Sequence, residues 1–283
     1  MPTIIMPTII IPAYNEEKNI SECLTPFLDY AGEEGLEVIV VCNGCKDSTA
    51  DVVKKLSHKF ICLETDIPSK TNALNLGEQY ANYYPRVYLD ADVVISIDAV
   101  KALIHSLEAS NYFACSMIPR MNTSRSSWFV RGFYDVWLSL PYCKAGMIGS
   151  GVYALSEKGR ARFDKFPDVI ADDGYVRCLF KEDERAVVKE HHSNVTAPKN
   201  ICSLIKIKTR SRLGGYQLRD KFPELMSNEF KDYRGAFNKL IFDYKMWPKL
   251  IIYIGVNFIS RIRANFQYVT KQTRWERDES SRQ

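Results

Sequence analysis

Short apolar runs that alternate with helix-like segments are the feature that most constrains how this chain can fold. Runs rich in β-forming residues occur at residues 8–11, 36–42, 60–63 and 87–89. Between them apolar residues recur at helical spacing, as at Ile20, Leu24, Phe27 and Leu28. The alternation predicts an α/β fold, a three-layer sandwich with a mostly parallel central sheet whose loops gather at one edge.

Local residue types predict where the elements begin and end. Pro12 cannot donate to a ladder and is expected to stop the first strand, after which Asn15 would cap a helix starting at Glu16. Pro26 should kink that helix or end it early, and Asp98 should cap a later helix over residues 99–107.

Composition points to an ordinary globular protein. At 283 residues, with 46% apolar and 25% charged residues, the chain is not expected to be disordered. No segment rich in Pro, Gly or Ser separates two domains. We therefore expect one domain over residues 1–215 and a helical, basic and aromatic extension over 216–283. Because residues 1–5 repeat as 6–10, Met6 is an alternative working start.

The cysteines and the N-terminus predict a reduced, cytoplasmic location. The start lacks the basic segment and cleavage site of a signal peptide. The eight cysteines show no repeated pairing. Cys42 and Cys45 have the spacing of half a zinc site or of a redox pair, but no second pair or His partner follows at suitable spacing. Their context indicates a turn.

Two acids one residue apart follow the strand at residues 87–89. Asp90 and Asp92 would emerge at the carboxyl end of that strand, which is where open α/β sheets bind ligands. Hard oxygen ligands on a short turn suit Mg²⁺ or Mn²⁺. A solvated turn is the alternative interpretation.

Four motifs in this order resemble those of the family 2 glycosyltransferases. The resemblance covers about residues 7–212 and implies the GT-A fold, which is Rossmann-like. Residues 9–17 match the opening motif of that family, and Lys70, Asn75 and Gly77 match a second segment. The motif Asp90-Ala91-Asp92 matches its metal-binding Asp-x-Asp, and Asp172-Asp173 its pair of acids.

The resemblance implies a role for each of these positions. A nucleotide-diphosphate sugar would be the donor, with Mn²⁺ or Mg²⁺ held by Asp92 and Asp90 against the diphosphate. Asp173 would be the base that deprotonates an acceptor hydroxyl, with Asp172 as the neighbouring candidate, and the anomeric carbon would be inverted. The other positions expected to contact the donor are Pro12, Ala13, Tyr14, Asn15, Glu16, Asn43, Lys70 and Ala91.

The chain also departs from the pattern of that family. Cys42-Asn43-Gly44 replaces two aspartates and a glycine, which leaves the donor base open between uracil, guanine and thymine. The Gln-x-x-Arg-Trp segment of processive members is absent. In its place Arg210 and Arg212, with two lysines before them, could cover the diphosphate or form a solvated basic face. His191-His192 is a candidate third metal ligand or a packing pair.

The C-terminal part predicts a surface contact. Residues 250–259 are apolar but too few to span a bilayer, which takes about 20 residues. Flanked by Lys245, Lys249, Arg261 and Arg263, they predict an interfacial helix on an anionic leaflet, at the inner face of the cytoplasmic membrane, or a helix packed on the domain.

The function that we expect is transfer of a sugar in cell-envelope, polysaccharide or glycolipid biosynthesis. The acceptor stays open between a glycan, a lipid-linked molecule and a small molecule, and no nucleic acid is expected as a partner. A nucleotidyltransferase would need a glycine-rich phosphate loop after the first strand, and residues 12–16 contain no glycine. A catalytically silent sugar-nucleotide-binding subunit is the third reading.

Overall fold

The computed structural model describes residues 7–32, 35–109, 112–144, 147, 149–229 and 242–271. The chain forms two compact units. Unit 1 comprises residues up to Arg120 together with Gly149–Asp168 and Phe180–Val195, and unit 2 comprises Met121–Ile148, Val169–Leu179 and Thr196–Gln283. The repeated residues 1–5 lie outside the described residues.

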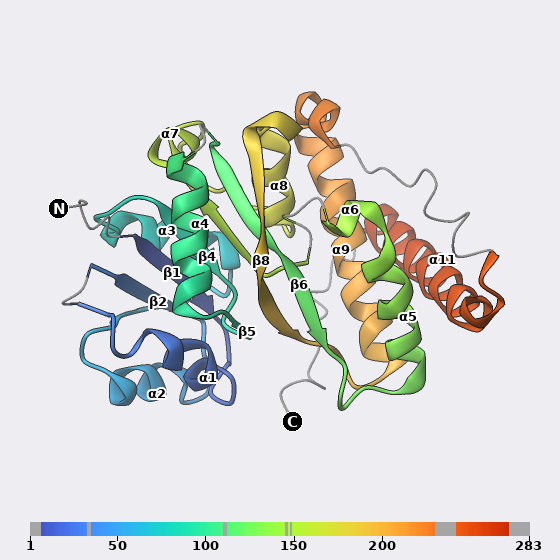
Figure 1. The fold of residues 1–283 in the computed structure, drawn as a ribbon, viewed down its shortest axis with the longest axis horizontal. Helices are drawn as coiled ribbons and strands as arrows, with labels where there is room; N and C mark the ends of the chain where they lie inside the picture. Colours follow the sequence, from blue (N-terminus) through green and yellow to red (C-terminus); the bar gives the residue numbers. More distant parts are fainter. Residues whose placement is uncertain are drawn as a thin grey trace. The chain divides into compact units, whose positions relative to one another are not determined.

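An eight-stranded sheet organises unit 1, in the order β3-β2-β1-β4-β7-β6-β8-β5 (Figure 1). The strands are β1 (Thr8–Ala13), β2 (Glu37–Asn43), β3 (Ile61–Thr65), β4 (Arg86–Leu89), β5 (Val93–Val94), β6 (Ala114–Asn122), β7 (Val152–Leu155) and β8 (Arg185–Thr196).

The half of the sheet built from β3, β2, β1 and β4 is parallel, as the apolar runs predict. In the other half, β7 pairs antiparallel with both β4 and β6, and β5 with β8. The prediction that Pro12 stops the first strand is wrong, because Pro12 pairs with Val41 inside β1. Pairing of β1 with β4 ends at Ile10, so Pro12 lies where the strand has one neighbour and a missing N–H can be tolerated.

Helices cover both faces of this sheet and produce the three layers that the sequence predicts. On one face Ile9, Ile11, Val38 and Val40 pack with residues of α1, α2 and α4, and on the other Ile39 and Val41 pack with Ala73 of α3. The helical segments of unit 1 are α1 (Ile20–Leu24), η1 (Thr25–Phe27), α2 (Thr49–Leu56), α3 (Lys70–Tyr80), α4 (Ile97–Ala109), α7 (Glu157–Arg160) and η2 (Glu182–Glu184).

Two helix starts differ from the sequence predictions. The first helix begins at Ile20 and not at Glu16, and Asn15 has a φ of 51° outside the helix. The later helix, α4, is capped by Ser96, whose Oγ accepts from the N–H of Ala99 at 3.2 Å, and Asp98 lies inside it. The early end at Pro26 is confirmed, because α1 stops at Leu24.

Unit 2 is mainly helical. Its core includes Val130, Phe133 and Val136 of α5, Leu204 of α9 and Val256 of α11. None of the helices within the described ranges is long and apolar enough to cross a membrane. Its helical segments are α5 (Trp128–Ser139), α6 (Pro141–Lys144), α8 (Asp172–Leu179), α9 (Ile201–Lys221), η3 (Pro223–Asn228), η4 (Tyr244–Met246) and α11 (Trp247–Val269).

The boundary expected at residue 215 falls inside α9 (Ile201–Lys221). Of the expected extension, residues 216–229 and 242–271 are described, and the remainder lies outside the described residues. That residues 216–283 form an extension of their own stays a prediction.

Candidate active site

The last residues of β1 and β2 and the loops that follow them are joined to each other, and we call residues 12–19 and 43–48 the edge loops. The N–H of Asn15 donates to Cys45 Sγ at 3.3 Å, and Cys45 Sγ lies 3.4 Å from the carbonyl oxygen of Ala13. Asn15 Oδ1 accepts from the N–H of Lys46 at 2.7 Å. These bonds engage the backbone N–H and the Oδ1 of Asn15 with the second loop, which explains why Asn15 does not cap a helix.

The second set of bonds ties the edge loops to the start of α2. The N–H of Glu16 donates to Thr49 Oγ1 at 2.8 Å, and Asp47 Oδ1 accepts from the hydroxyl of Thr49 at 2.5 Å. Asn43 is 4% exposed, whereas Tyr14 and Asn15 are half-buried and reachable from solvent. An aromatic ring and amide groups at such an edge can stack on and hydrogen-bond to a planar ligand.

Lys70 and Asp90 form an ion pair at the same edge of the sheet. Lys70 Nζ lies 2.7 Å from Asp90 Oδ1, with 27% and 37% of the two side chains exposed. Lys70 is the first residue of α3, which Ser69 caps by accepting from the N–H of Asn72. The backbone N–H of Asp90 donates to the carbonyl of Gly151 at 2.8 Å, which fixes the turn after β4.

The pKa of a buried thiol indicates that this region is negatively charged. Cys23 of α1 is fully buried, and burial raises the pKa of its thiol, helped by the carboxylates of Asp92, Asp90 and Glu16. These acids therefore lie close enough to act on one sulfur. Ala91 between the two aspartates is buried, and Asp92 is half-buried.

The residues present fit a divalent cation that takes few protein ligands. Within the described ranges no three His, Cys, Asp or Glu side chains gather to hold a metal. Two carboxylates at an exposed edge suit Mg²⁺ or Mn²⁺, which keep positions for water and phosphate oxygens. A third ligand from His191-His192 is not supported. The sheet register pairs Val94 with Asn194, so the histidines continue away from Asp92, and His192 Nδ1 contacts the backbone oxygen of His191 at 2.8 Å.

The pair of acids Asp172-Asp173 lies in unit 2, in the first turn of α8. Asp172 is 3% exposed, whereas Asp173 is half-buried and its Oδ1 accepts from the N–H of Gly174 at 2.7 Å. The helix N-terminus favours negative charge at both positions. The more accessible carboxylate is therefore Asp173.

Helix α9 braces the segment before these acids. Gln217 Oε1 accepts from the N–H of Ile170 at 2.8 Å. Gly214 lies against Ala171, since a Cβ on Gly214 would come within 2.7 Å of the Ala171 Cβ.

The alternating basic residues of α9 do not form a single row, because the segment is helical. Lys208 Nζ lies over the rings of Phe133 and Trp137 of α5, at 5.1 and 4.6 Å. Arg212 donates to Asn257 Oδ1 at 2.7 Å on α11. The expectation that Arg212 covers a diphosphate therefore has a competing contact, and Arg210 lies on the other side of α9 by helical spacing.

The predicted residues thus fall into two groups. Unit 1 brings Pro12, Ala13, Tyr14, Asn15, Glu16, Asn43, Lys70, Asp90, Ala91 and Asp92 to one edge of its sheet. Unit 2 carries Asp172, Asp173, Arg210 and Arg212.

Sequence reasoning missed Gly151 and Thr49. Gly151 has a φ of 62°, and a Cβ there would lie 2.5 Å from Val93 Cγ2 and 3.2 Å from Asp90 Oδ2. The cluster of glycines before β7 was the available signal for this close approach. Thr49 had no signal beyond its place at a helix start.

A parallel half-sheet with acids and polar loops at its carboxyl edge, continued by antiparallel strands, is the architecture of the GT-A glycosyltransferases. The chain belongs to glycosyl transferase family 2, whose model matches residues 8–159, more than half of its length.

Curated relatives and solved structures agree with this assignment. The chain is 27% identical over 252 residues to a poly-β-1,6-N-acetyl-D-glucosamine synthase of Staphylococcus epidermidis, covering 82% of this chain and 60% of that protein. For a synthase of the same name from Staphylococcus aureus, identity is 25% over 276 residues, covering 88% and 64%. The chain therefore spans about three fifths of the length of these relatives.

Two solved structures share the fold at low sequence identity. A mannosyltransferase from Pyrobaculum calidifontis, in complex with GDP-Man and Mn²⁺, has a TM-score of 0.65 at 18% identity, covering 96% of this chain and 89% of that one. Glucosyl-3-phosphoglycerate synthase from Mycobacterium tuberculosis, in complex with Mn²⁺, UDP-Glc and phosphoglyceric acid, has a TM-score of 0.56 at 18% identity, covering 76% and 79%.

Proposed function

We propose that the protein transfers a sugar from a nucleotide-diphosphate donor to an acceptor hydroxyl, with inversion and with a divalent cation. The observation that carries the proposal is the Lys70–Asp90 ion pair beside Asp92, at the sheet edge that also holds the edge loops. Family membership and the nucleotide sugars bound by the solved neighbours support it.

The edge loops would hold the nucleoside. Tyr14 offers a ring face for stacking, and Asn43 offers both a donor and an acceptor to the base edge. Glu16 is 5% exposed and accepts from Asn19 Nδ2 at 2.8 Å, so its part is to fix the loop. The bonds that join the two loops keep them in place before a ligand arrives.

The diphosphate would meet the charges at Lys70, Asp90 and Asp92. The ammonium of Lys70 pairs with Asp90, and 27% of the Lys70 side chain is exposed, so this side chain can also face a phosphate oxygen. Asp92 and Asp90 would hold Mg²⁺ or Mn²⁺, which supplies Lewis-acid stabilisation of the leaving diphosphate. That Arg210 and Arg212 contact the diphosphate stays a prediction from the sequence, and the guanidinium of Arg212 also bonds to Asn257 of α11.

Asp173 would act as the general base. Its carboxylate takes the proton of the acceptor hydroxyl while the acceptor oxygen attacks the anomeric carbon and the bond to the diphosphate breaks on the opposite face. The buried Asp172 would position the first turn of α8. The names of the curated relatives suggest only the chemical class of the acceptor. We propose a polysaccharide or a related cell-envelope glycan.

A donor screen tests this proposal. The full chain is incubated with Mn²⁺ and a panel of UDP-, GDP- and dTDP-sugars, and release of the nucleoside diphosphate is followed. We expect turnover with donors of one base and loss of most of it in Asp92→Asn. Asp98→Asn, at an exposed acid of α4, is the control. Absence of turnover with every donor, or an Asp92→Asn variant as active as the wild type, would contradict the proposal.

We also propose that unit 2 contacts a membrane surface through α11. The side of this helix that packs on α5 and α9 carries Tyr253, Val256, Ser260 and Ala264. The opposite side exposes large apolar residues, among them Ile251 at 70% and Phe258 at 63%. A helix normally buries its apolar stripe, so the exposed stripe needs another apolar medium.

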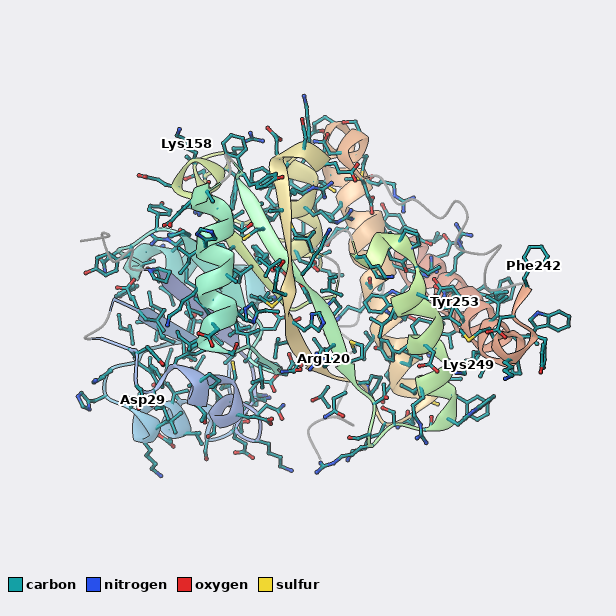
Figure 2. The ribbon with its side chains drawn as sticks, in the orientation of Figure 1. Asp29, Arg120, Lys158, Phe242, Lys249 and Tyr253 are labelled. Carbon is teal, nitrogen blue, oxygen red and sulfur yellow. The ribbon has the colours of Figure 1, made fainter. Side chains whose placement is uncertain are left out.

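Basic residues border this stripe and favour an anionic bilayer as that medium. Arg261 is exposed, and Lys245 and Lys271 lie at the two ends of the helix. Lys249 is already paired with Asp135 at 2.6 Å. In Figure 2, Tyr253 lies toward α5 whereas Phe242, 88% exposed, projects away from the helices of unit 2.

A further inference from the structure

A pocket of about 370 Å³ lies between α9 and α11 of unit 2. Tyr216, Arg219 and Asp220 of α9 line it, together with Asn265 and Tyr268 of α11. The two helices pack on each other and lie side by side in Figure 1. Sites for small molecules have volumes from about 300 Å³ upward, so this pocket is large enough for one. The proposed function uses none of the residues that line it.

Two tyrosine rings form the apolar part of the pocket. The ring centres of Tyr216 and Tyr268 are 5.6 Å apart and the ring planes are inclined by 67°, which is an edge-to-face arrangement. Tyr268 is 37% exposed, so a ligand can reach its ring. The weakly positive C–H groups of a sugar ring pack well on the negative face of an aromatic ring. The pocket therefore suits a ligand that has an apolar face.

The polar side chains of the pocket can both donate and accept hydrogen bonds. A guanidinium only donates, a carboxylate only accepts, and an amide does both. The guanidinium of Arg219 lies over the ring of Tyr216, with Cζ 5.4 Å from the ring centre. Within the part of the chain that the structure describes, no ion pair or side-chain hydrogen bond engages Arg219 or Asn265. Hydroxyl groups also donate and accept, so a polyhydroxylated ligand matches this mixture.

The charges of the pocket favour a neutral ligand. Arg219 and Asp220 carry opposite charges, so the side chains that line the pocket sum to zero. A phosphate would be attracted by Arg219 but repelled by Asp220, and for an amine the two effects are exchanged. A neutral saccharide meets neither repulsion and has both an apolar face and hydroxyl groups.

Helix α9 separates the pocket from the pair of acids in α8. The opposite side of α9 faces those acids, since a Cβ on Gly214 would lie 2.7 Å from the Ala171 Cβ, and Leu218 Cδ1 lies 3.1 Å from the position of a Cβ on Gly174. A helix with its side chains is roughly 10–12 Å thick. A sugar in the pocket is therefore not the one that would react at Asp173.

We propose that this pocket, which we call the α9–α11 pocket, binds a neutral saccharide and holds part of a glycan away from its reacting end. Tyr268 would pack on one face of a sugar unit, while Arg219, Asp220 and Asn265 bond to its hydroxyl groups. Saccharide binding rests only on the residues of the pocket. The role toward the acceptor rests on the proposed function, because it takes the acceptor to be a glycan.

Calorimetric titration of the full chain with neutral tetrasaccharides of glucose, mannose and N-acetylglucosamine, without nucleotide, tests the binding. Tyr268→Ala should weaken binding about three- to tenfold. Asn265→Ala, at an exposed residue whose loss leaves the helix packing intact, should weaken it about threefold or more. Tyr244→Ala in η4, at a residue that is 71% exposed and outside the pocket, is the matched control. Absence of binding to all three saccharides, or binding that neither pocket variant weakens, would overturn the proposal.

Asp220→Asn distinguishes a saccharide from an anionic ligand such as a phospholipid headgroup. Loss of the charge should weaken saccharide binding severalfold, because hydrogen bonds to a carboxylate are stronger than those to an amide. The same change should strengthen binding of an anion, because it removes a repulsion. The probes for this arm are inorganic phosphate and vesicles that contain phosphatidylglycerol. Binding of either probe that depends on Tyr268 and Arg219, without binding of a saccharide, would overturn the proposal.

Transfer kinetics test the role toward the acceptor. With donor and Mn²⁺ present, Tyr268→Ala should raise the KM for a tetrasaccharide acceptor about three- to tenfold and leave kcat and the KM for the donor nearly unchanged. Saccharide binding without turnover of any donor would contradict the proposed function and leave the α9–α11 pocket as a saccharide site. Transfer whose acceptor KM is the same in Tyr268→Ala and in the wild type would overturn the role toward the acceptor.

Discussion

Asp90 is held from several directions, and each contact bears on what its carboxylate can do. Lys70 Nζ lies 2.7 Å from one carboxylate oxygen, and the backbone of Asp90 bonds to Gly151 and Val93. The pair with Lys70 compensates one negative charge in a region that already contains Asp92 and Glu16. Lys70 and Asp90 therefore act as a unit, and removal of either leaves the other charge without its partner.

Asp173→Asn separates donor binding from transfer. None of the unit 1 residues assigned to the donor needs the charge of Asp173, so nucleotide affinity should stay nearly unchanged. Loss of a general base should lower the transfer rate by about 10²–10⁴-fold. Calorimetry with nucleotide and single-turnover kinetics measure the two effects.

Asp172→Asn is the matched control, since the two acids are neighbours in the same turn of α8. Asp172→Asn should affect stability more than Asp173→Asn does, because Asp172 is only 3% exposed. If Asp172→Asn abolished transfer in a folded protein and Asp173→Asn did not, the base would be Asp172. If both variants transferred sugar normally, the inverting mechanism would have to be abandoned.

The ion pair between Arg162 and Glu184 predicts an acid-dependent contribution to stability in unit 1. Arg162 bonds both carboxylate oxygens, at 2.6 and 2.9 Å, and lowers the pKa of Glu184 to about 2. Because the folded pKa lies below the ordinary value of 4.5, this stability is present above pH 4.5 and is lost as the pH falls toward 2.

Glu184→Gln should therefore lower the melting temperature at pH 7, by an amount that corresponds to roughly 1 kcal/mol, and the difference from the wild type should shrink toward pH 3. Glu64→Gln removes a more exposed pair, Lys54–Glu64, whose side chains are 53% and 57% exposed, and should have a smaller effect. A difference for Glu184→Gln that grew on acidification would contradict the assignment.

At the scale of elements, Gly77 sets how closely α3 approaches the sheet. A Cβ at this position would lie 2.6 Å from Ile10 Cγ2, a distance that requires the helix or the strand to shift. Helix α3 also begins with Lys70, so such a shift would move the partner of Asp90.

Gly77→Ala should destabilise the protein by about 1–3 kcal/mol through overpacking, although alanine is the better helix former. Gly215→Ala in α9 is the matched control, because a Cβ there meets nothing within 4 Å. That variant should be neutral or up to about 1 kcal/mol more stable. Denaturant unfolding measures both, and an equally stable Gly77→Ala would contradict the tight contact.

The sequence predicts best the elements whose run of apolar residues indicates that they are buried. The continuous run at residues 36–42 becomes the buried strand β2 (Glu37–Asn43), because both faces of the sheet are covered. The start of α1 was misplaced, because Asn15 bonds to Lys46 of a loop that is 31 residues away in the sequence. The alternating basic residues at 206–212 were expected to cover the diphosphate or to form a solvated basic face, but in helix α9 Lys208 and Arg212 pack on α5 and α11, which the sequence could not show.

On the scale of the whole molecule, sequence motifs identify the site residues whose side chains carry a charge or a possible metal ligand. The sequence predicts Asp90, Asp92 and Lys70, and the structure places them together in unit 1. It could not reveal that Gly151 contacts Asp90, because these residues are far apart in the sequence and only the antiparallel pairing of β4 with β7 brings them together. The role of each of these residues in catalysis stays a prediction.

The last prediction concerns how the molecule meets a membrane. If the exposed stripe of α11 enters an anionic leaflet, the full chain should sediment with vesicles that contain phosphatidylserine or phosphatidylglycerol, and binding should weaken as salt is raised. Phe258→Asp places a charge in the middle of the stripe, at a residue that is 63% exposed. It should lower vesicle binding about tenfold or more, because a buried aromatic ring contributes roughly 1.5–3 kcal/mol.

Tyr80→Asp is the control for this change, since it makes the same charge change at an aromatic residue of unit 1 that is 50% exposed. Its vesicle binding should match that of the wild type. Equal binding to neutral and anionic vesicles would contradict the proposed attraction between the basic residues and the anionic leaflet. Absence of binding to both would contradict the membrane contact. Size-exclusion chromatography with light scattering then separates this outcome from self-association, because a second copy covering α11 would produce a dimer that Phe258→Asp dissociates while Tyr80→Asp does not.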